Sequence, residues 1–200
     1  MSNFEPVDLE EIKSRKGALR REAMERREAL PALDRISAAK TIAARGLPLK
    51  LAPGTIVSGY SPLKSEISPM PLLRRCADDG AAIALPVVVG RGHPLTMRAW
   101  AFGAPLTSGV WGIREPPPAA PEVFPDVLIV PLLAFDRRGH RIGYGAGYYD
   151  MTLAKLRAMK KVTAIGISFA TQEIDKVPTT PRDAPLDFVL TERESIDVGA

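Results

Sequence analysis

The sequence predicts an α/β fold, in which a mostly parallel sheet is covered by helices on both faces and preceded by a pair of helices. Two observations lead to this prediction. Short apolar runs that are typical of buried strands recur along the chain, and segments with helical periodicity lie between several of them. Because parallel strands need long crossover connections, this alternation favours a parallel sheet packed between helices. The apolar runs are residues 55–60, 82–86, 126–131, 162–168 and 188–191.

The N-terminal segment predicts the pair of helices. Apolar residues recur at helical spacing in a stretch full of Lys, Arg and Glu, which describes one long amphipathic helix with a single apolar stripe. A second helix is expected over residues 34–46, where Asp34 is a suitable N-cap and Gly46 a suitable stop. The apolar positions of the first helix are Leu9, Ile12, Leu19, Ala23 and Leu30.

The rest of the chain supplies the remaining elements. Helical stretches are expected at residues 70–79 and 148–159, between the apolar runs. Residues 95–101 alternate in the manner of an edge or antiparallel strand. Residues 115–125 are rich in proline and predict a stiff surface connection without regular structure. Since the sequence contains no internal repeat and no evident boundary, residues 1–200 are expected to form a single domain.

Composition limits the class of function. The chain has 200 residues, of which 46% are hydrophobic and 25% charged, as is typical of a globular protein with a sizeable core. A formal charge of +4 suits an anionic small molecule and is too small to indicate nucleic acid by itself. Cys76 is the only cysteine, so disulfides and cysteine-based metal sites are excluded. The N-terminus has no apolar stretch, from which we expect a cytoplasmic protein without a membrane partner. We also expect a monomer.

One segment is unusually rich in glycine. Residues 139–150 read GHRIGYGAGYYD and connect the apolar run at 126–131 to a predicted helix. A glycine-rich loop that enters a helix presents backbone N–H groups and the positive end of the helix dipole, which together suit a phosphate. The glycines alone leave an ordinary surface loop equally open, because their spacing is neither that of G-x-G-x-x-G nor that of a Walker loop.

The residues around the glycines favour phosphate and nucleotide. Arg141, expected on the loop with little core around it, supplies a planar fork of donors for phosphate oxygens. Tyr148 and Tyr149 supply flat faces and hydroxyl groups, and Asp150 is a suitable ligand for a hard cation such as Mg²⁺. A phosphate, a ring and a metal together indicate a nucleotide site.

These residues also carry a resemblance to a known family. The series Pro131, Ala134, Phe135, Asp136, Gly139 and then Arg141 to Asp150 is similar to the signature of the 5-formyltetrahydrofolate cyclo-ligases, also called methenyltetrahydrofolate synthetases. The resemblance extends over about residues 13–195. It implies a Rossmann-like three-layer fold and an enzyme that uses ATP and Mg²⁺ to close 5-formyltetrahydrofolate, polyglutamylated or not, to 5,10-methenyltetrahydrofolate. ADP and phosphate are released, and a phosphorylated formyl imidate is the implied intermediate.

The resemblance also implies roles for individual residues. Arg141 and Tyr148 are the expected catalytic residues, and Asp150 and Asp183 the expected magnesium ligands. The residues expected to bind ATP are Lys16, Arg20, Arg141, Ile142, Gly143, Tyr144, Gly145, Ala146, Gly147, Tyr148 and Tyr149. The residues expected to bind the folate are Tyr60, Glu66, Trp111, Tyr144 and Tyr148.

Several of these residues have simpler explanations. Lys16 and Arg20 are four residues apart and share a helical face, which is as typical of a solvated surface as of a phosphate site. The carboxylate of Glu66 can accept hydrogen bonds from a pterin amino group and ring N–H, but it also suits a helix N-terminus. Tyr60 and Trp111 are equally explained by packing.

The chain departs from the family pattern at a few positions. Arg182 stands where the family commonly has histidine before the aspartate, so the identity of the metal ligands at this end of the site stays open. Asp187 competes with Asp183 as a metal ligand, but we expect it to precede or cap the last strand. Leu132 replaces a frequent glycine. Ala146 does so too, from which we expect an ordinary φ there, because a positive φ would cost alanine about 1 kcal/mol.

Three other functions are compatible with parts of the pattern. A small-molecule kinase would share the nucleotide site and differ in its acceptor. A folate- or nucleotide-binding protein without turnover would lack one of the phosphate-neutralising residues, whereas Lys16, Arg20 and Arg141 are all present. An RNA-binding module would interleave aromatic residues with its basic ones, and the basic first helix has none. The pattern therefore favours an enzyme.

Overall fold

A computed structural model describes residues 9–199 of the chain. Within this range one sheet of seven strands has the order β11-β10-β9-β6-β1-β2-β3. Its inner strands are parallel, while the edge strands β3 and β11 run antiparallel to their neighbours. The strands are β1 (Ile56–Ser58), β2 (Ala82–Val87), β3 (Thr96–Ala99), β6 (Val127–Pro131), β9 (Thr163–Ile167), β10 (Phe188–Leu190) and β11 (Ser195–Asp197).

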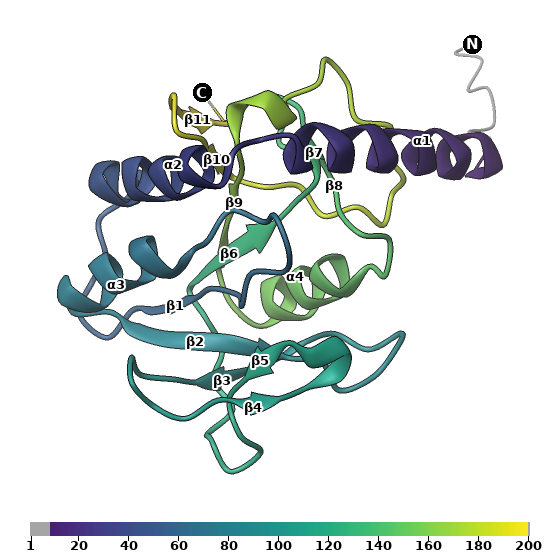
Figure 1. Cartoon of the computed structure of the whole chain (residues 1–200). Helices are drawn as coiled ribbons and strands as arrows, with labels where there is room; N and C mark the ends of the chain where they lie inside the picture. Colours follow the sequence, from purple (N-terminus) through teal and green to yellow (C-terminus); the bar gives the residue numbers. More distant parts are fainter. Residues whose placement is uncertain (1–8, 200) are drawn as a thin grey trace.

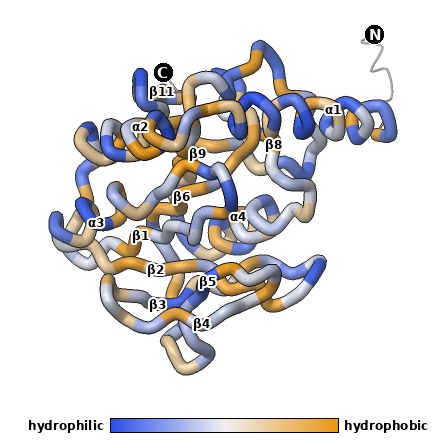
Figure 2. The backbone as a smooth tube through the Cα atoms, in the orientation of Figure 1, coloured by the Kyte–Doolittle hydropathy of each residue, from blue (hydrophilic) through white to orange (hydrophobic). Residues whose placement is uncertain are grey.

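Helices cover both faces of this sheet, as predicted (Figure 1). The helices α2 (Ala32–Arg45) and α3 (Met70–Asp78) pack into one apolar cluster with one set of strand residues, and α4 (Tyr148–Met159) packs into a second cluster with the other set. In β6 the side chains alternate accordingly, since Val127 and Ile129 belong to the first cluster and Leu128 and Val130 to the second. A strand buried on both faces reads as a continuous apolar run, which is why the sequence signal is strong. The hydrophobic residues gather along these central strands in Figure 2.

The N-terminal pair of helices is also present. The first helix, α1 (Leu9–Glu28), begins within the predicted stretch but ends before Leu30, and its N-terminal Leu9 is 59% exposed. Its buried residues are Lys16, Ala23 and Arg27, of which only Ala23 belongs to the predicted apolar stripe. The second helix ends at Gly46 as predicted, with a φ of 82°, but the predicted N-cap was wrong: α2 begins after Pro31, and Asp34 lies in its first turn.

Several very short elements were not predicted. A two-residue pair, β4 (Thr107–Ser108) and β5 (Arg114–Glu115), encloses the 3-10 turn η1 (Val110–Gly112). A second pair, β7 (Ala134–Phe135) and β8 (Arg141–Ile142), lies within the segment expected to be loop, and η2 (Ala170–Gln172) follows β9. The proline-rich segment was placed one residue too early, because Glu115 belongs to β5. The predicted edge strand is β3, which pairs antiparallel with β2.

The order of the strands indicates where a ligand-binding crevice is expected. The strands β1 and β6 are parallel neighbours in the sheet. The chain continues from β1 to β2 on one side and from β6 to β9 on the other, so the connections leave β1 and β6 in opposite directions. Ligands of open α/β sheets bind beyond the carboxyl ends of strands at such a switch point. Here residues 61–69 follow β1, and the β7–β8 pair followed by the glycine loop comes after β6. The helix α1 packs on that pair through an apolar cluster that includes Ala23, Ala134 and Ile142, and lies beside β7 and β8 in Figure 1.

Candidate functional site

The glycine loop, residues 143–147, connects β8 to the N-terminus of α4. Gly145 has a φ of 98°, and Gly147, the N-cap of α4, has a φ of 70°. Both conformations favour glycine, because a Cβ atom is strained in the left-handed region. Among the described residues only Lys64 and Trp111 combine a side chain with a positive φ, so the ordinary φ predicted for Ala146 is confirmed.

The backbone of this loop is available to a ligand. In the part of the chain that the structure describes, none of the N–H groups of residues 143–147 donates a hydrogen bond. They lie directly before the first turn of α4, whose own N–H groups have no partner within the helix. An oxyanion placed there would meet several donors and the positive end of the helix dipole. The local geometry therefore suits a phosphate.

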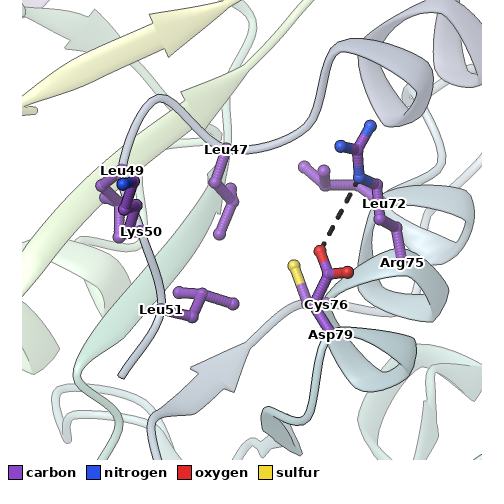
Figure 3. Close-up of a pocket in the computed structure, with 8 residues that line it drawn as sticks. All are labelled: Leu47, Leu49, Lys50, Leu51, Leu72, Arg75, Cys76 and Asp79. Carbon is purple, nitrogen blue, oxygen red and sulfur yellow. Dashed lines mark ion pairs between the residues drawn. The ribbon is translucent and has the colours of Figure 1, made fainter. Parts of the chain in front are cut away.

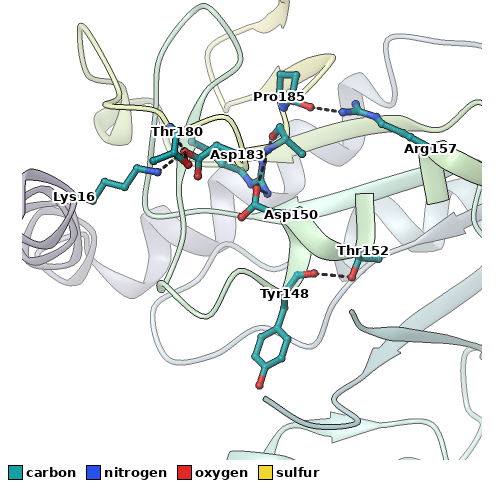
Figure 4. Close-up of polar contacts among 10 residues, drawn as sticks. Lys16, Tyr148, Asp150, Thr152, Arg157, Thr180, Asp183 and Pro185 are labelled. Carbon is teal, nitrogen blue, oxygen red and sulfur yellow. Dashed lines mark hydrogen bonds and ion pairs between the residues drawn. The ribbon is translucent and has the colours of Figure 1, made fainter. Parts of the chain in front are cut away.

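Two basic side chains of α1 lie at this end of the site, and one of them contacts the glycine loop. The Lys16 ammonium lies 2.6 Å from the Asp183 carboxylate, and both side chains are largely buried (Figure 4). Arg20 donates from Nε to the carbonyl of Gly143 at 2.8 Å. Burial lowers the pKa of Arg20, an effect that nearby Asp183 partly offsets. The interpretation of these two residues as a solvated surface was wrong for Lys16, which is 9% exposed.

Arg141 is held inside the protein by its own partners. It was expected on the loop with little core around it, but it lies in β8 and is only 8% exposed. Its Nη2 donates to Asp150 at 2.7 Å, and its Nη1 donates to the carbonyl of Ala184. Asp150 also accepts the N–H of Ala184 at 3.1 Å. Arg141 therefore ties the first turn of α4 to the segment after Asp183.

A second group of polar side chains lies on the β1 side of the crevice. The Glu66 carboxylate accepts the N–H of Leu63 at 2.7 Å. Burial raises the pKa of Glu66, opposed by the Leu63 N–H, by Tyr144 and by Arg27. The alternative explanation as a helix N-terminal residue was wrong, because α3 begins at Met70. Tyr60 is buried and donates to the carbonyl of Ile67 at 2.7 Å.

Arg27 is the cation of this group, and sequence reasoning missed it. It is 1% exposed, donating from Nε to Ser65 Oγ at 3.0 Å and from Nη2 to the Tyr144 hydroxyl at 2.8 Å. Burial raises the pKa of Tyr144 to about 12, with a further contribution from Glu66. A signal was present in the sequence, because positions 16, 20, 23 and 27 of one helix share a face.

Three aromatic residues complete the neighbourhood. Burial raises the pKa of Tyr149, and Glu66 raises it further. Tyr148, at the start of α4, has its ring centroid 6.2 Å from that of Trp111. Trp111 has a φ of 57° and is 66% exposed, so its explanation as a core residue was wrong. In Figure 4 the Tyr148 ring points away from Asp150 and Asp183, which places it toward the other side of the site.

The geometry can be compared with known proteins. The model of the 5-formyltetrahydrofolate cyclo-ligase family matches residues 12–192. The chain belongs to this family. The predicted resemblance is thereby confirmed, over nearly the range expected, and the chain is a member of a family of ligases. The resemblance also implied a fold of three layers, and the structure confirms it, because helices pack on both faces of one central sheet.

Individual cyclo-ligases resemble the chain over most of their length. The 5-formyltetrahydrofolate cyclo-ligase of Mycolicibacterium smegmatis is 34% identical over 189 residues, which are 90% of this chain and 95% of the relative. That of Escherichia coli K12 is 31% identical over 144 residues, 68% of this chain and 76% of the relative. The solution structure of 5,10-methenyltetrahydrofolate synthetase from Aquifex aeolicus superposes with a TM-score of 0.74 at 26% identity, covering 92% of this chain and 93% of that one.

The two candidate metal ligands lie at the same end of the site. One oxygen of Asp150 pairs with Arg141 and one of Asp183 with Lys16, while Asp150 Oδ2 and Asp183 Oδ1 take part in no hydrogen bond within residues 9–199. No group of three or more His, Cys, Asp or Glu in that range could hold a metal alone. Mg²⁺ is commonly held by one or two carboxylates together with substrate phosphates. The donor set fits a magnesium ion that arrives with ATP. The competing candidate, Asp187, accepts from Arg157 and precedes β10, as expected.

One cavity lies away from this chemistry. It has a volume of about 360 Å³ and is enclosed by the segment before β1 and by α3 (Figure 3). Its residues therefore lie where the parallel strands begin, at the opposite edge of the sheet from the glycine loop. Cys76 lines it, and burial raises the pKa of this thiol to about 11. Within residues 9–199 no helix combines the length and apolar character needed to cross a membrane.

Proposed function

We propose that the protein closes 5-formyltetrahydrofolate to 5,10-methenyltetrahydrofolate with hydrolysis of ATP to ADP and phosphate. One observation carries the proposal beyond family membership. The loop at the start of α4 has N–H groups that donate to no acceptor within residues 9–199, and Arg20 of α1 donates to its Gly143 carbonyl at 2.8 Å. This combination suits the phosphates of ATP. The neighbouring carboxylate of Glu66 suits the donors of a pterin ring.

The chemical steps follow from the poor leaving ability of an amide oxygen. The formyl oxygen attacks the γ-phosphorus, a new P–O bond forms and ADP leaves. The folate nitrogen at position 10 then attacks the activated carbon, loses its proton, and the phosphate departs with the former formyl oxygen. Both steps depend mainly on alignment and on neutralising phosphate charge.

We assign the protein's contribution to named groups. Lys16, Arg20 and the N–H groups of residues 143–147 bind phosphate oxygens. Arg141 acts by fixing Asp150 at the start of α4, and Tyr148 lies toward the folate together with Trp111. Asp150 and Asp183 would hold Mg²⁺, which when bound neutralises part of the phosphate charge.

The roles of the remaining predicted residues follow the same division. We place Tyr60, Glu66 and Tyr144 on the folate side, since all of them surround Arg27 or the loop after β1. Ile142 and Tyr149 support the glycine loop from β8 and α4.

An omission assay tests the proposal. The purified protein is incubated with 5-formyltetrahydrofolate, ATP and Mg²⁺, each omitted in turn, and the methenyl product is followed by its absorbance. We expect product only in the complete mixture. Product that forms unchanged without ATP, or no product in the complete mixture, contradicts the proposal. ADP formation without ring closure would indicate a kinase.

A pair of lysine variants locates the phosphate site. Lys16→Ala removes a buried cation and is expected to lower kcat/KM for ATP by about 100-fold, as for other groups that stabilise transition-state charge. Lys13 lies one turn earlier in α1 with a side chain that is 77% exposed. Lys13→Ala is therefore the matched control and should leave the rate unchanged. Equal losses in both variants would contradict the assignment.

A further inference from the structure

Arg27 contacts both substrate loops of the proposed reaction. Ser65, to which its Nε donates at 3.0 Å, lies in the loop after β1 that carries Glu66. Tyr144, to which its Nη2 donates at 2.8 Å, lies in the glycine loop. These loops are 79 positions apart in the sequence, counted from residue 65 to residue 144, and follow different strands. The guanidinium of Arg27 therefore connects the folate side of the crevice to the phosphate side, where Tyr144 also hydrogen-bonds the Glu66 carboxylate.

The connection is rigid. Ser65 is 6% exposed and Arg27 1% exposed, so neither group exchanges its partner readily for water. The planar guanidinium fixes the directions of its donors, unlike a lysine ammonium. Charge-assisted hydrogen bonds of this kind are stronger than neutral ones. Arg27 also sits in α1, the helix that supplies Lys16 and Arg20, so its position is coupled to that of the phosphate-binding cations.

The third nitrogen of Arg27 argues for a functional reason. Nη1 is buried and has no hydrogen-bond partner among the described residues. A buried donor without a partner costs free energy, and such groups in folded proteins call for an explanation. Uncompensated groups of this kind are commonly found at functional sites.

We propose that Arg27 is a positioning residue, which holds the loop of Ser65 and Glu66 and the glycine loop at the separation that aims the formyl oxygen at the γ-phosphate. The inference rests on the proposed function. It concerns the alignment of the two substrates, and it assigns Arg27 no contact with the reacting atoms. A misplacement of about 1 Å in such an arrangement can cost about 100-fold in rate.

The test separates alignment from binding and from folding. Arg27→Met keeps an unbranched side chain of similar reach and removes both hydrogen bonds. We expect kcat to fall by about 100-fold, while the dissociation constants for ATP and for 5-formyltetrahydrofolate, each measured alone at equilibrium, change less than about threefold. Arg21→Ala, an exposed arginine of the same helix, is the control and should keep kcat.

Two milder variants keep the proposal testable if Arg27→Met does not fold. Ser65→Ala removes the bond of Arg27 to the first loop, and Tyr144→Phe removes its bond to the glycine loop together with the hydrogen bond of the Tyr144 hydroxyl to Glu66. Each should lower kcat, and their effects should be less than additive, since either one already releases the connection. Unchanged kcat in both, or a loss explained entirely by the affinity for one substrate, would overturn the proposal.

The same experiment distinguishes this inference from the proposed function. If the wild-type protein forms no methenyl product, the proposed function fails. If the wild type forms product and Arg27→Met turns over at the wild-type rate per folded molecule, the function stands and the role of Arg27 is wrong.

Discussion

The two halves of the crevice satisfy their charged groups differently. On the phosphate side each basic residue has an acceptor in the protein: Lys16 pairs with Asp183, Arg20 with a Gly143 carbonyl and Arg141 with Asp150. On the folate side the Glu66 carboxylate is partly buried with a raised pKa, and Nη1 of Arg27 has no hydrogen-bond partner among residues 9–199. The phosphate side is thus preorganised by internal pairs, whereas the folate side retains polar groups whose burial is incompletely compensated.

This difference has a physical meaning for binding. Paired cations are already oriented, so a phosphate can meet them without ordering their side chains again. A partly buried carboxylate in a poorly compensating environment gains more from a ligand with N–H donors, because part of its water has already been removed. We therefore expect substitutions on the phosphate side to lower the free energy of unfolding. Substitution of Glu66 on the folate side should instead weaken substrate binding with little loss of stability.

The largest effect on stability is expected from Arg141→Ala. The variant leaves Asp150 without its buried cation and removes a bond to Ala184, and should cost about 3 kcal/mol of the free energy of unfolding. Arg157→Ala is the matched control, because its pair with Asp187 is more exposed, 28% and 44%, and should cost less than about 1 kcal/mol. Urea denaturation measures both. Equal losses would show that Arg141 is not an internal tie.

Asp183→Asn should have the next largest effect. Burial alone would raise the pKa of Asp183, but hydrogen bonds from Lys16 and Thr180 lower it. Its ionised form therefore contributes stability above its unfolded value of 3.8, and this contribution is lost as the pH falls through the lower folded pKa. We expect a loss of about 2 kcal/mol at neutral pH, which shrinks below about pH 4. A difference that does not change with pH would contradict the pairing.

The main elements of the fold could be predicted because their signals are local. The run at Val127–Pro131 is apolar on both faces, and the period of 3.6 marks the helices. The pairs β4–β5 and β7–β8 could not be predicted, since strands of two residues exist only through their partners. The end of α2 at Gly46 was predictable from its backbone preference, whereas the N-cap at Pro31 displaced the expected Asp34.

The sequence motifs predicted which segments form the site, but not which of its side chains are buried. The glycine loop and Glu66 follow strands whose ends could be located in the sequence. The burial of Lys16 and Arg27 could not, because a basic helix predicts a solvated surface unless the acceptors are known. Those acceptors, Asp183, Ser65 and Tyr144, come from three distant segments. Tertiary contacts reversed the expected exposure.

Gly145→Ala should have a smaller effect that remains on the phosphate side. The added Cβ would lie 3.3 Å from the Arg20 guanidinium carbon in a backbone with a φ of 98°. We expect a cost of about 1 kcal/mol from the strained φ. Gly143→Ala is the control, because its Cβ would meet nothing within 4 Å and its φ is ordinary. Thermal denaturation compares the two, and an equal shift in Tm would contradict the role of Gly145.

Glu66→Gln should have the smallest effect on stability, with the opposite sign to Asp183→Asn. The folded pKa of Glu66 is raised, so its contribution is fully present below the unfolded value of 4.5 and is lost as the pH rises through the folded pKa. At neutral pH the glutamine variant should therefore be as stable as the wild type or slightly more so. Its KM for 5-formyltetrahydrofolate should rise by about 10- to 100-fold, because a charge-assisted acceptor is lost.

The two acid variants together test whether the halves differ. Urea denaturation of Asp183→Asn and Glu66→Gln between acid and neutral pH should give stability differences from the wild type that change in opposite directions. If both variants lose stability at neutral pH and recover it in acid, Glu66 is compensated in the same way as Asp183. The carboxylate would then be part of the internal pairing, and the folate side would have no unmet acceptor for a pterin to satisfy.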